Sequence, residues 1–340
     1  MINRRVQLLV AALGLGLALL MGVLWFIHDQ IQSRPLMDPE MPAQVLDIPS
    51  GTGVVGILQR MEAVGLTFDP LALRVYLRLK GMDLRLQAGE YAVSPSDTAA
   101  GLMQRIARGA VIEYSFTIIE GWRYTDLIDA LAAHPKIAFD LLEGQDPAAV
   151  MKAIGREGIH PEGQFLPETY RFTRGTSALR LLERANRALE VALAAAWETR
   201  AVDSPLTSPY EALILASIIE KETGLAEERR KIAGVFSRRI NLGMRLQTDP
   251  TVIYGLGEAF TGRLSRQDLR TDTPWNTYTR HGLPPTPIAL AGAASIHAAV
   301  DPAEGDALFF VSRGDGSHVF SVTLEAHNAA VRRYILGKDD

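Results

Sequence analysis

Residues 208–223, SPYEALILASIIEKET, carry the clearest structural pattern in the C-terminal half of this chain. Ser208 can cap a helix, Pro209 suits the first helical position, and Glu211 stands where a capping box needs an acid. Residues 212–219 are apolar or small on every face, which is typical of a helix buried on all sides. We therefore expect a domain core built around this helix.

Two glutamates follow the apolar run. Helical spacing puts Glu220 in register with Leu213 and Ser217, at the end of a buried helix where desolvation would raise its pKa and suit it to general acid catalysis. A structural hydrogen bond or a helix-end charge is the alternative role for Glu220. Glu222 points elsewhere, beside Lys221, and we expect it to be solvated.

The N-terminus predicts a membrane anchor. Residues 8–27 form an uncharged apolar run of 20 residues, long enough to cross about 30 Å of hydrocarbon as a helix. Arg4 and Arg5 precede this run, so the positive-inside rule keeps residues 1–7 in the cytosol and exports the remainder. A cleaved signal peptide is the alternative, but the small residues of a cleavage site do not follow Ile27.

Composition limits the other possibilities. The 340 residues suffice for about two domains with hydrophobic cores. A net charge of −4 lacks the basic footprint of a nucleic-acid-binding protein, and the chain has no cysteine for disulfides or thiolate chemistry. Residues 28–43 carry three prolines and predict a short stiff linker, or else the end of the first domain.

The region after the linker repeats a strand, a turn and a helix. This order recurs at residues 46–61, 89–106 and 116–131. It suggests small α+β modules of the LysM type, which bind N-acetylated glycans, and we assign residues 44–112 to a LysM-like domain. Ordinary α+β packing is the alternative.

Two more segments show helical patterns. Residues 178–199 carry an apolar stripe typical of a scaffold helix, and residues 138–159 also look helical. We see no catalytic chemistry in the second segment.

Polar and aromatic residues concentrate in two later loops, residues 242–255 and 273–287. Aromatic rings can stack on pyranose faces, and amides can bond sugar hydroxyls or N-acetyl groups. Rigid surface loops are the alternative, since turns rich in proline are common. The candidate substrate contacts are Gln247, Thr248, Asp249, Tyr254, Asn276, Tyr278 and, from an earlier turn, Glu168.

Residues 216–223 resemble the signature of the MltG (YceG-like) endolytic murein transglycosylases. The resemblance continues, in order and with similar spacing, at residues 162–170, 246–255, 276–285, 308–311 and 318–328. It therefore covers roughly residues 46–334. Trp275 and Thr286 depart from the family pattern, since a smaller aromatic residue and a glycine are expected there.

The resemblance implies an α+β protein with an N-terminal transmembrane helix, a LysM-like module and a lytic-transglycosylase-type catalytic domain. We expect the catalytic domain over residues 113–340, with its core at residues 203–335. It also implies a single-pass protein of the inner (cytoplasmic) membrane with a periplasmic catalytic domain. Its partners would be nascent peptidoglycan strands and penicillin-binding peptidoglycan synthases.

The same resemblance makes Glu220 the catalytic residue. A protonated Glu220 would donate to the glycosidic oxygen between N-acetylmuramic acid and N-acetylglucosamine. Its carboxylate would then deprotonate the muramyl 6-hydroxyl, which closes to a 1,6-anhydro end, with no metal or cofactor. Asp249 and Glu168 are possible second carboxylates, for which we favour structural or substrate-positioning roles.

A non-catalytic wall-binding scaffold for peptidoglycan synthases is the alternative function. The anchor and a LysM-like domain would serve either protein, so only the chemistry of the carboxyl group distinguishes them. The spacing of His318 and His327 fits no standard set of metal ligands.

Overall fold

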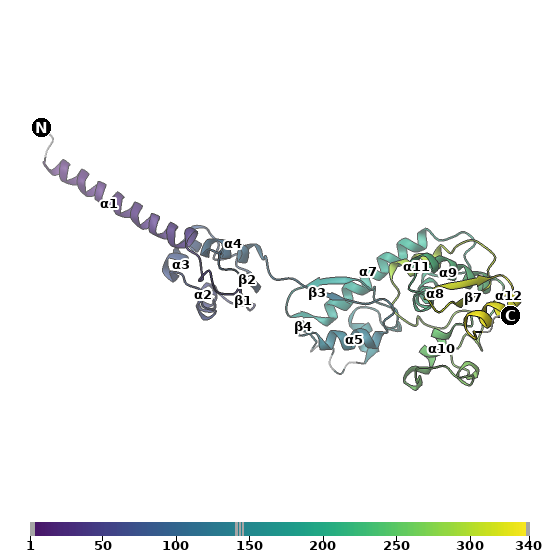
Figure 1. Cartoon of the computed structure of the whole chain (residues 1–340). Coiled ribbons are helices and arrows are strands. Elements are labelled where there is room, and N and C mark those ends of the chain that lie inside the picture. The colour runs from purple at the N-terminus through teal and green to yellow at the C-terminus, as the bar shows by residue number, and fades with distance from the viewer. Residues whose placement is uncertain (1–3, 140–141, 143, 145, 338–340) are drawn as a thin grey trace. The chain divides into compact units, whose positions relative to one another are not determined.

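The computed structural model describes residues 4–139, 142, 144 and 146–337. The chain divides into two compact units: unit 1 holds residues 1–114 and 172–174, and unit 2 holds residues 115–171 and 175–340. Mixed helices and strands build both units, as the sequence predicts (Figure 1). The observed boundary at 114/115 lies two residues beyond the expected one.

Unit 1 begins with the apolar helix α1 (Arg4–His28). Within the described part of the chain, one helical stretch, Val6–Ser33, is long and apolar enough to cross a membrane, with a mean hydropathy of 2.4. The unit continues with η1 (Asp29–Ser33), β1 (Gln44–Ile48), α2 (Val54–Ala63), α3 (Pro70–Leu79), β2 (Gly89–Val93) and α4 (Ala99–Arg108). β1 and β2 pair antiparallel, with Leu46 opposite Tyr91, and both side chains are fully buried.

The segment expected as a linker, residues 28–43, contributes to the core of unit 1. Ile31, Leu36 and Met37 are at most 4% exposed and belong to this core, in which η1, the element that carries Ile31, packs on α3 and α4. The backbone of Leu36 is also bonded on both sides: its N–H donates to Asp97 O at 2.8 Å, and its carbonyl accepts from Thr67 N at 2.6 Å. This part of the segment is packed structure.

The remaining elements belong almost wholly to unit 2. The paired strands are β3 with β5, β4 with β6 in parallel, and β7 with β8 antiparallel. The elements in order are β3 (Tyr114–Thr117), α5 (Tyr124–Ala133), β4 (Ile137–Ala138), α6 (Pro147–Ala153), β5 (Thr169–Phe172), β6 (Thr176–Ser177), α7 (Ala178–Glu198), α8 (Pro209–Glu222), α9 (Ala226–Asn241), α10 (Asp249–Leu256), η2 (Gly257–Ala259), η3 (Asp268–Arg270), α11 (Ala293–Val300), β7 (Phe309–Ser312), β8 (His318–Ser321) and α12 (Leu324–Tyr334).

The scaffold helix is confirmed as α7. The helix expected over 138–159 is wrong in extent, because only α6 forms there, started by Asp146, whose carboxylate accepts from Ala148 N at 3.1 Å. Residues 140, 141, 143 and 145 of that expectation lie outside the described residues. The third strand–turn–helix repeat, β3 and α5, lies mainly in unit 2.

Helix α8 is the centre of unit 2, as predicted. Every residue from Ala212 to Ile219 is buried, and α7, α9 and α11 pack around it (Figure 1). Ser208 caps the helix by accepting from Glu211 N at 3.2 Å. The Ser217 hydroxyl accepts from Ile288 N at 3.0 Å, which fixes the proline-rich loop to the buried helix.

Candidate active site

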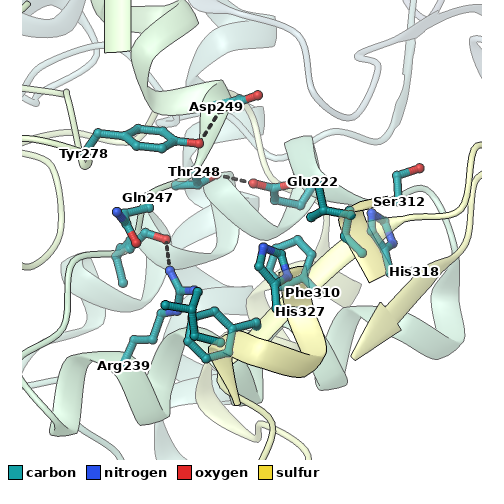
Figure 2. A pocket seen from close by; sticks show the side chains of 15 residues that line it. Glu222, Arg239, Gln247, Thr248, Asp249, Tyr278, Phe310, Ser312, His318 and His327 are labelled. Carbon is teal, nitrogen blue, oxygen red and sulfur yellow. Dashed lines mark hydrogen bonds between the residues drawn. The ribbon is translucent and has the colours of Figure 1, made fainter. Parts of the chain in front are cut away.

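A cavity of about 470 Å³ lies at the C-terminal end of α8. Its walls come from the ends of α8 and α9, the segment before α10, the strands β7 and β8, and α12 (Figure 2). Sequence-distant elements therefore converge on the last turn of the buried helix.

Glu222, the last residue of α8, faces this cavity (Figure 2). The Thr248 hydroxyl donates a hydrogen bond to its Oε1. The pKa of Glu222 is raised to about 7, chiefly by burial; the Thr248 hydrogen bond opposes this rise, the neighbouring Asp249 adds to it, and His318 opposes it. Near neutral pH this one carboxyl group can both donate and accept a proton. Glu222 is half-buried and hydrogen-bonded to Thr248, so it is less solvated than expected.

The segment 247–249 supplies three predicted substrate residues to the cavity. Gln247 has a φ of +51°, a left-handed conformation that is unfavourable for a side chain larger than glycine and that clusters at functional sites. Thr248 is only 2% exposed, whereas Gln247 and Asp249 are exposed. The predicted loop ends earlier than expected, because Asp249 begins helix α10 with Pro250 in its first turn.

Tyr278 completes the group of predicted residues around Glu222. Its hydroxyl donates to Asp249 Oδ1 at 2.5 Å (Figure 2). Burial raises the pKa of Tyr278 well above its usual range, and the bond to Asp249 raises it further, so the phenol remains a hydrogen-bond donor. The structure thus brings Gln247, Thr248, Asp249 and Tyr278 to one cavity.

Glu220 lies in a different environment. Its side chain is 5% exposed, and its Oε2 accepts from Gly292 N at 2.9 Å, at the start of α11. Its Oε1 is 3.7 Å from the Arg229 guanidinium, which is also 3.7 Å from a carboxylate oxygen of Glu120. Burial raises the pKa of Glu120, and the nearby charge of Glu220 adds to this effect. Glu220 therefore belongs to an ionic cluster with Arg229 and Glu120, and this cluster reaches the surface, because the Glu120 side chain is 47% exposed.

Tyr254 lines a second cavity, of about 650 Å³, together with Arg123, Glu162 and Trp275. The Arg123 guanidinium lies 5.3 Å from the centroid of the Tyr254 ring. Glu162 is 4% exposed and accepts from Tyr124 N at 3.0 Å. Burial raises the pKa of Glu162 to about 7.

The last two predicted substrate residues have other surroundings. Asn276 is fully buried and turns its amide into its own loop, donating to carbonyls of the 268–271 turn and accepting from Tyr278 N at 2.8 Å. Glu168 is exposed, and its backbone carbonyl accepts from Ile118 N at 3.0 Å where β5 begins.

The sequence did not predict two residues that hold the cavity wall in place, Arg239 and Glu228. Arg239 donates to Leu246 O and to Leu308 O, each at 2.7 Å, and so joins the segment before α10 to the start of β7. Glu228 is 6% exposed and lies 2.7 Å from Nδ1 of His318 in the cavity wall. Among the described residues, no group of three or more His, Cys, Asp or Glu side chains could hold a metal ion.

The cavity holds a carboxyl group of raised pKa beside hydroxyl, amide and carboxylate groups, an arrangement that suits a polar ligand and proton transfer. The chain belongs to the YceG-like family, which matches residues 46–333.

Its relatives carry a functional name. The chain is 30% identical over 336 residues to an endolytic murein transglycosylase of Bacillus subtilis, covering 93% of this chain and 91% of that protein. It is 25% identical over 327 residues to the protein of the same name in Streptococcus pneumoniae, covering 86% of this chain and 58% of that protein. A crystal structure of a YceG-like protein from Listeria monocytogenes aligns with a TM-score of 0.54 and 31% identity, over 84% of this chain and 98% of that one.

Proposed function

We propose that this protein is an endolytic murein transglycosylase that cuts peptidoglycan glycan strands between N-acetylmuramic acid and N-acetylglucosamine. The names of its relatives support the reaction class. The observation that carries the proposal is the Glu222 carboxyl group, whose pKa of about 7 suits proton transfer in both directions, in a cavity lined by Gln247 and Asp249.

The geometry supports Glu222 as the acid/base better than Glu220. Glu222 faces a cavity large enough for a sugar ring, and Thr248 orients its carboxyl group. The two oxygens of Glu220 already have partners, since one accepts from Gly292 N and the other lies 3.7 Å from Arg229. We therefore propose Glu222 as the first candidate for the acid/base and keep Glu220, the residue that the family resemblance implies, as the second; Glu220 also holds the start of α11.

The proposed reaction needs one carboxyl group and no water. Protonated Glu222 donates its proton to the glycosidic oxygen as the bond from that oxygen to C1 breaks. The resulting carboxylate removes the proton of the muramyl 6-hydroxyl, whose oxygen then bonds to C1. The products are a 1,6-anhydro muramyl end and a free hydroxyl on the departing N-acetylglucosamine, and Glu222 is protonated again.

Neighbouring groups have separate proposed roles. Thr248 stabilises the carboxylate of Glu222 as it ionises, because a hydrogen bond to a charged acceptor is stronger than one to a neutral acceptor. Gln247, Asp249 and Tyr278 contact the sugar. Tyr254 and Glu168 remain proposed substrate contacts, although neither lines the cavity that Glu222 faces. Asn276 supports the loop that carries Tyr278.

The wider arrangement is also proposed. Helix α1 anchors the chain in the cytoplasmic membrane with residues 1–7 in the cytosol, and unit 1 acts as a LysM-like glycan-binding module. The α+β order of unit 1 supports that assignment. A periplasmic location would place unit 2 beside nascent strands and the penicillin-binding synthases that make them.

Product analysis tests the reaction. Purified protein is incubated with uncross-linked peptidoglycan strands, and the released fragments are identified by mass spectrometry. The proposal predicts internal cleavage with 1,6-anhydro ends. Reducing ends would replace it with hydrolysis, in which Asp249 is the candidate second carboxylate. Binding without cleavage would favour the scaffold alternative.

A further inference from the structure

Helix α3 in unit 1 has two apolar faces. The inner face is buried in the core, with Leu73 and Leu77 at 0% and 1% exposure. The outer face carries Leu71, Val75 and Leu79, which are 68%, 37% and 71% exposed and recur every four residues. Single exposed leucines are ordinary on a protein surface, but a row along one helix face indicates a contact surface.

Positive charges border this row. Arg74 and Arg78 are exposed and share the outer face with the apolar side chains, and Lys80, Leu84 and Arg85 follow, with Leu84 at 91% exposure. Arg78 donates to Asp83 at 2.9 Å, yet its side chain remains 80% exposed. Leucine and arginine on one exposed face are typical of a helix that lies in a lipid headgroup layer, where long basic side chains reach the phosphates.

The position of α3 in the chain brings this face close to the anchor. Ile27, the last residue of the apolar run, packs against the core of unit 1, and Ile31 is fully buried in that core. Four residues of helix rise by only about 6 Å. Both α1 and η1 contact α3. If α1 spans the bilayer, unit 1 begins at the membrane surface without a free tether.

We infer that the outer face of α3 docks on the bilayer that anchors α1. Leu71, Val75 and Leu79 enter the headgroup region, and Arg74 and Arg78 bind the phosphates of anionic lipids. This surface holds unit 1 against the membrane. The inference rests on the proposed anchor but is independent of the chemistry at Glu222.

The absence of cysteine from the sequence makes a clean test possible. The full chain is reconstituted into vesicles of phosphatidylcholine with phosphatidylglycerol, carrying a single Leu79→Cys substitution labelled with an environment-sensitive fluorophore. Val55→Cys, on α2, is the matched control, because Val55 is an apolar residue of the same unit with 58% exposure. Quenching by nitroxide-labelled lipid is compared with quenching by aqueous iodide.

The inference predicts that the Leu79→Cys label emits at shorter wavelength, is quenched by the lipid nitroxide and is protected from iodide, whereas the Val55→Cys label is quenched by iodide. Adding Arg74→Gln and Arg78→Gln should weaken the docking equilibrium about thirtyfold, at about 1 kcal/mol for each charge near an anionic surface. Pure phosphatidylcholine should weaken it likewise.

Equal behaviour of the two labels, or docking that is unchanged in neutral vesicles and in the arginine variant, overturns the inference. Flotation of the same vesicles reports the insertion of α1 separately. A chain that floats while its Leu79→Cys label stays open to iodide contradicts the surface alone. Cleavage of glycan strands by the same preparation shows that the proposed activity is intact.

Discussion

Replacing Thr248 by valine should move the alkaline limb of the pH–rate profile to higher pH. The Thr248 hydroxyl donates to the Glu222 carboxylate and so favours its charged form. Valine keeps the shape of threonine but cannot donate. Because Thr248 is 2% exposed, water has little room to replace the lost hydroxyl. The pKa of Glu222 should therefore rise further above its present value of about 7.

The size of the shift follows from the strength of the lost bond. A hydrogen bond to a charged group contributes about 1.5–3 kcal/mol. At about 1.4 kcal/mol for each pH unit, its loss raises the pKa by about one to two units. The active form is the protonated acid, so wild-type activity should decline as the pH rises through about 7. In Thr248→Val the same decline should begin one to two units higher.

The assay is the initial rate of glycan cleavage between pH 5 and 10. Thr251→Val is the matched control, because the Thr251 hydroxyl donates to Thr248 O at 2.7 Å and bonds Thr277, but does not bond Glu222. The control should lose stability and keep the wild-type limb. An unmoved limb in Thr248→Val, or an equal shift in Thr251→Val, would refute the assignment of the limb to Glu222.

Three further predictions concern stability. Ser217→Ala leaves Ile288 N without its buried acceptor and should lower the free energy of unfolding by about 1–3 kcal/mol, measured by urea denaturation. Gln247→Gly relieves the left-handed backbone conformation, whose strain costs a non-glycine residue about 1–2 kcal/mol, while glycine's greater freedom in the unfolded chain offsets part of this gain. The free energy of unfolding should therefore rise by up to about 1 kcal/mol, and the cleavage rate should fall because the side chain is lost. An unchanged cleavage rate would exclude Gln247 from the substrate site. Burial raises the pKa of Glu162 to about 7, so its stabilising effect is complete below about pH 4.5 and is lost as the pH rises through 7. Between pH 5 and 8 the free energy of unfolding, measured by urea denaturation, should therefore fall by up to about 3 kcal/mol more in the wild type than in Glu162→Gln. Equal decreases in the two proteins would contradict the raised pKa of Glu162.

Local patterns sufficed for the helix at the centre of unit 2. An uninterrupted apolar run with a serine cap and a proline start predicts a helix buried on all sides, and α8 is one. The polar segment 247–249 and Tyr278 were candidates from sequence, because hydrogen-bonding and aromatic residues suit sugar binding, but the same pattern also fits a rigid surface loop. The structure places these residues in one cavity.

The surroundings of Glu222 could not be predicted from its neighbours in sequence. Lys221 and Glu227 suggest a solvated end of the helix, but the groups around Glu222 come from Thr248, Phe310 and His318, between 26 and 96 residues further along the chain. Helical periodicity predicts which faces of α8 are buried from the residues of that helix alone. It gives no information about the strands that cover the end of the helix. The same limit applies to residues 28–43, where proline suggested a tether and tertiary packing buried Ile31.

The most direct test compares Glu222→Gln with Glu220→Gln by mass spectrometry of the fragments released from uncross-linked strands, after both variants have been shown to fold by thermal unfolding. In Glu220→Gln the amide oxygen can still accept from Gly292 N. The account predicts that Glu222→Gln releases no anhydromuramyl-ended products and that Glu220→Gln still does. Anhydro products from a folded Glu222→Gln protein, or their loss in both folded variants, would contradict the assignment of the acid/base to Glu222.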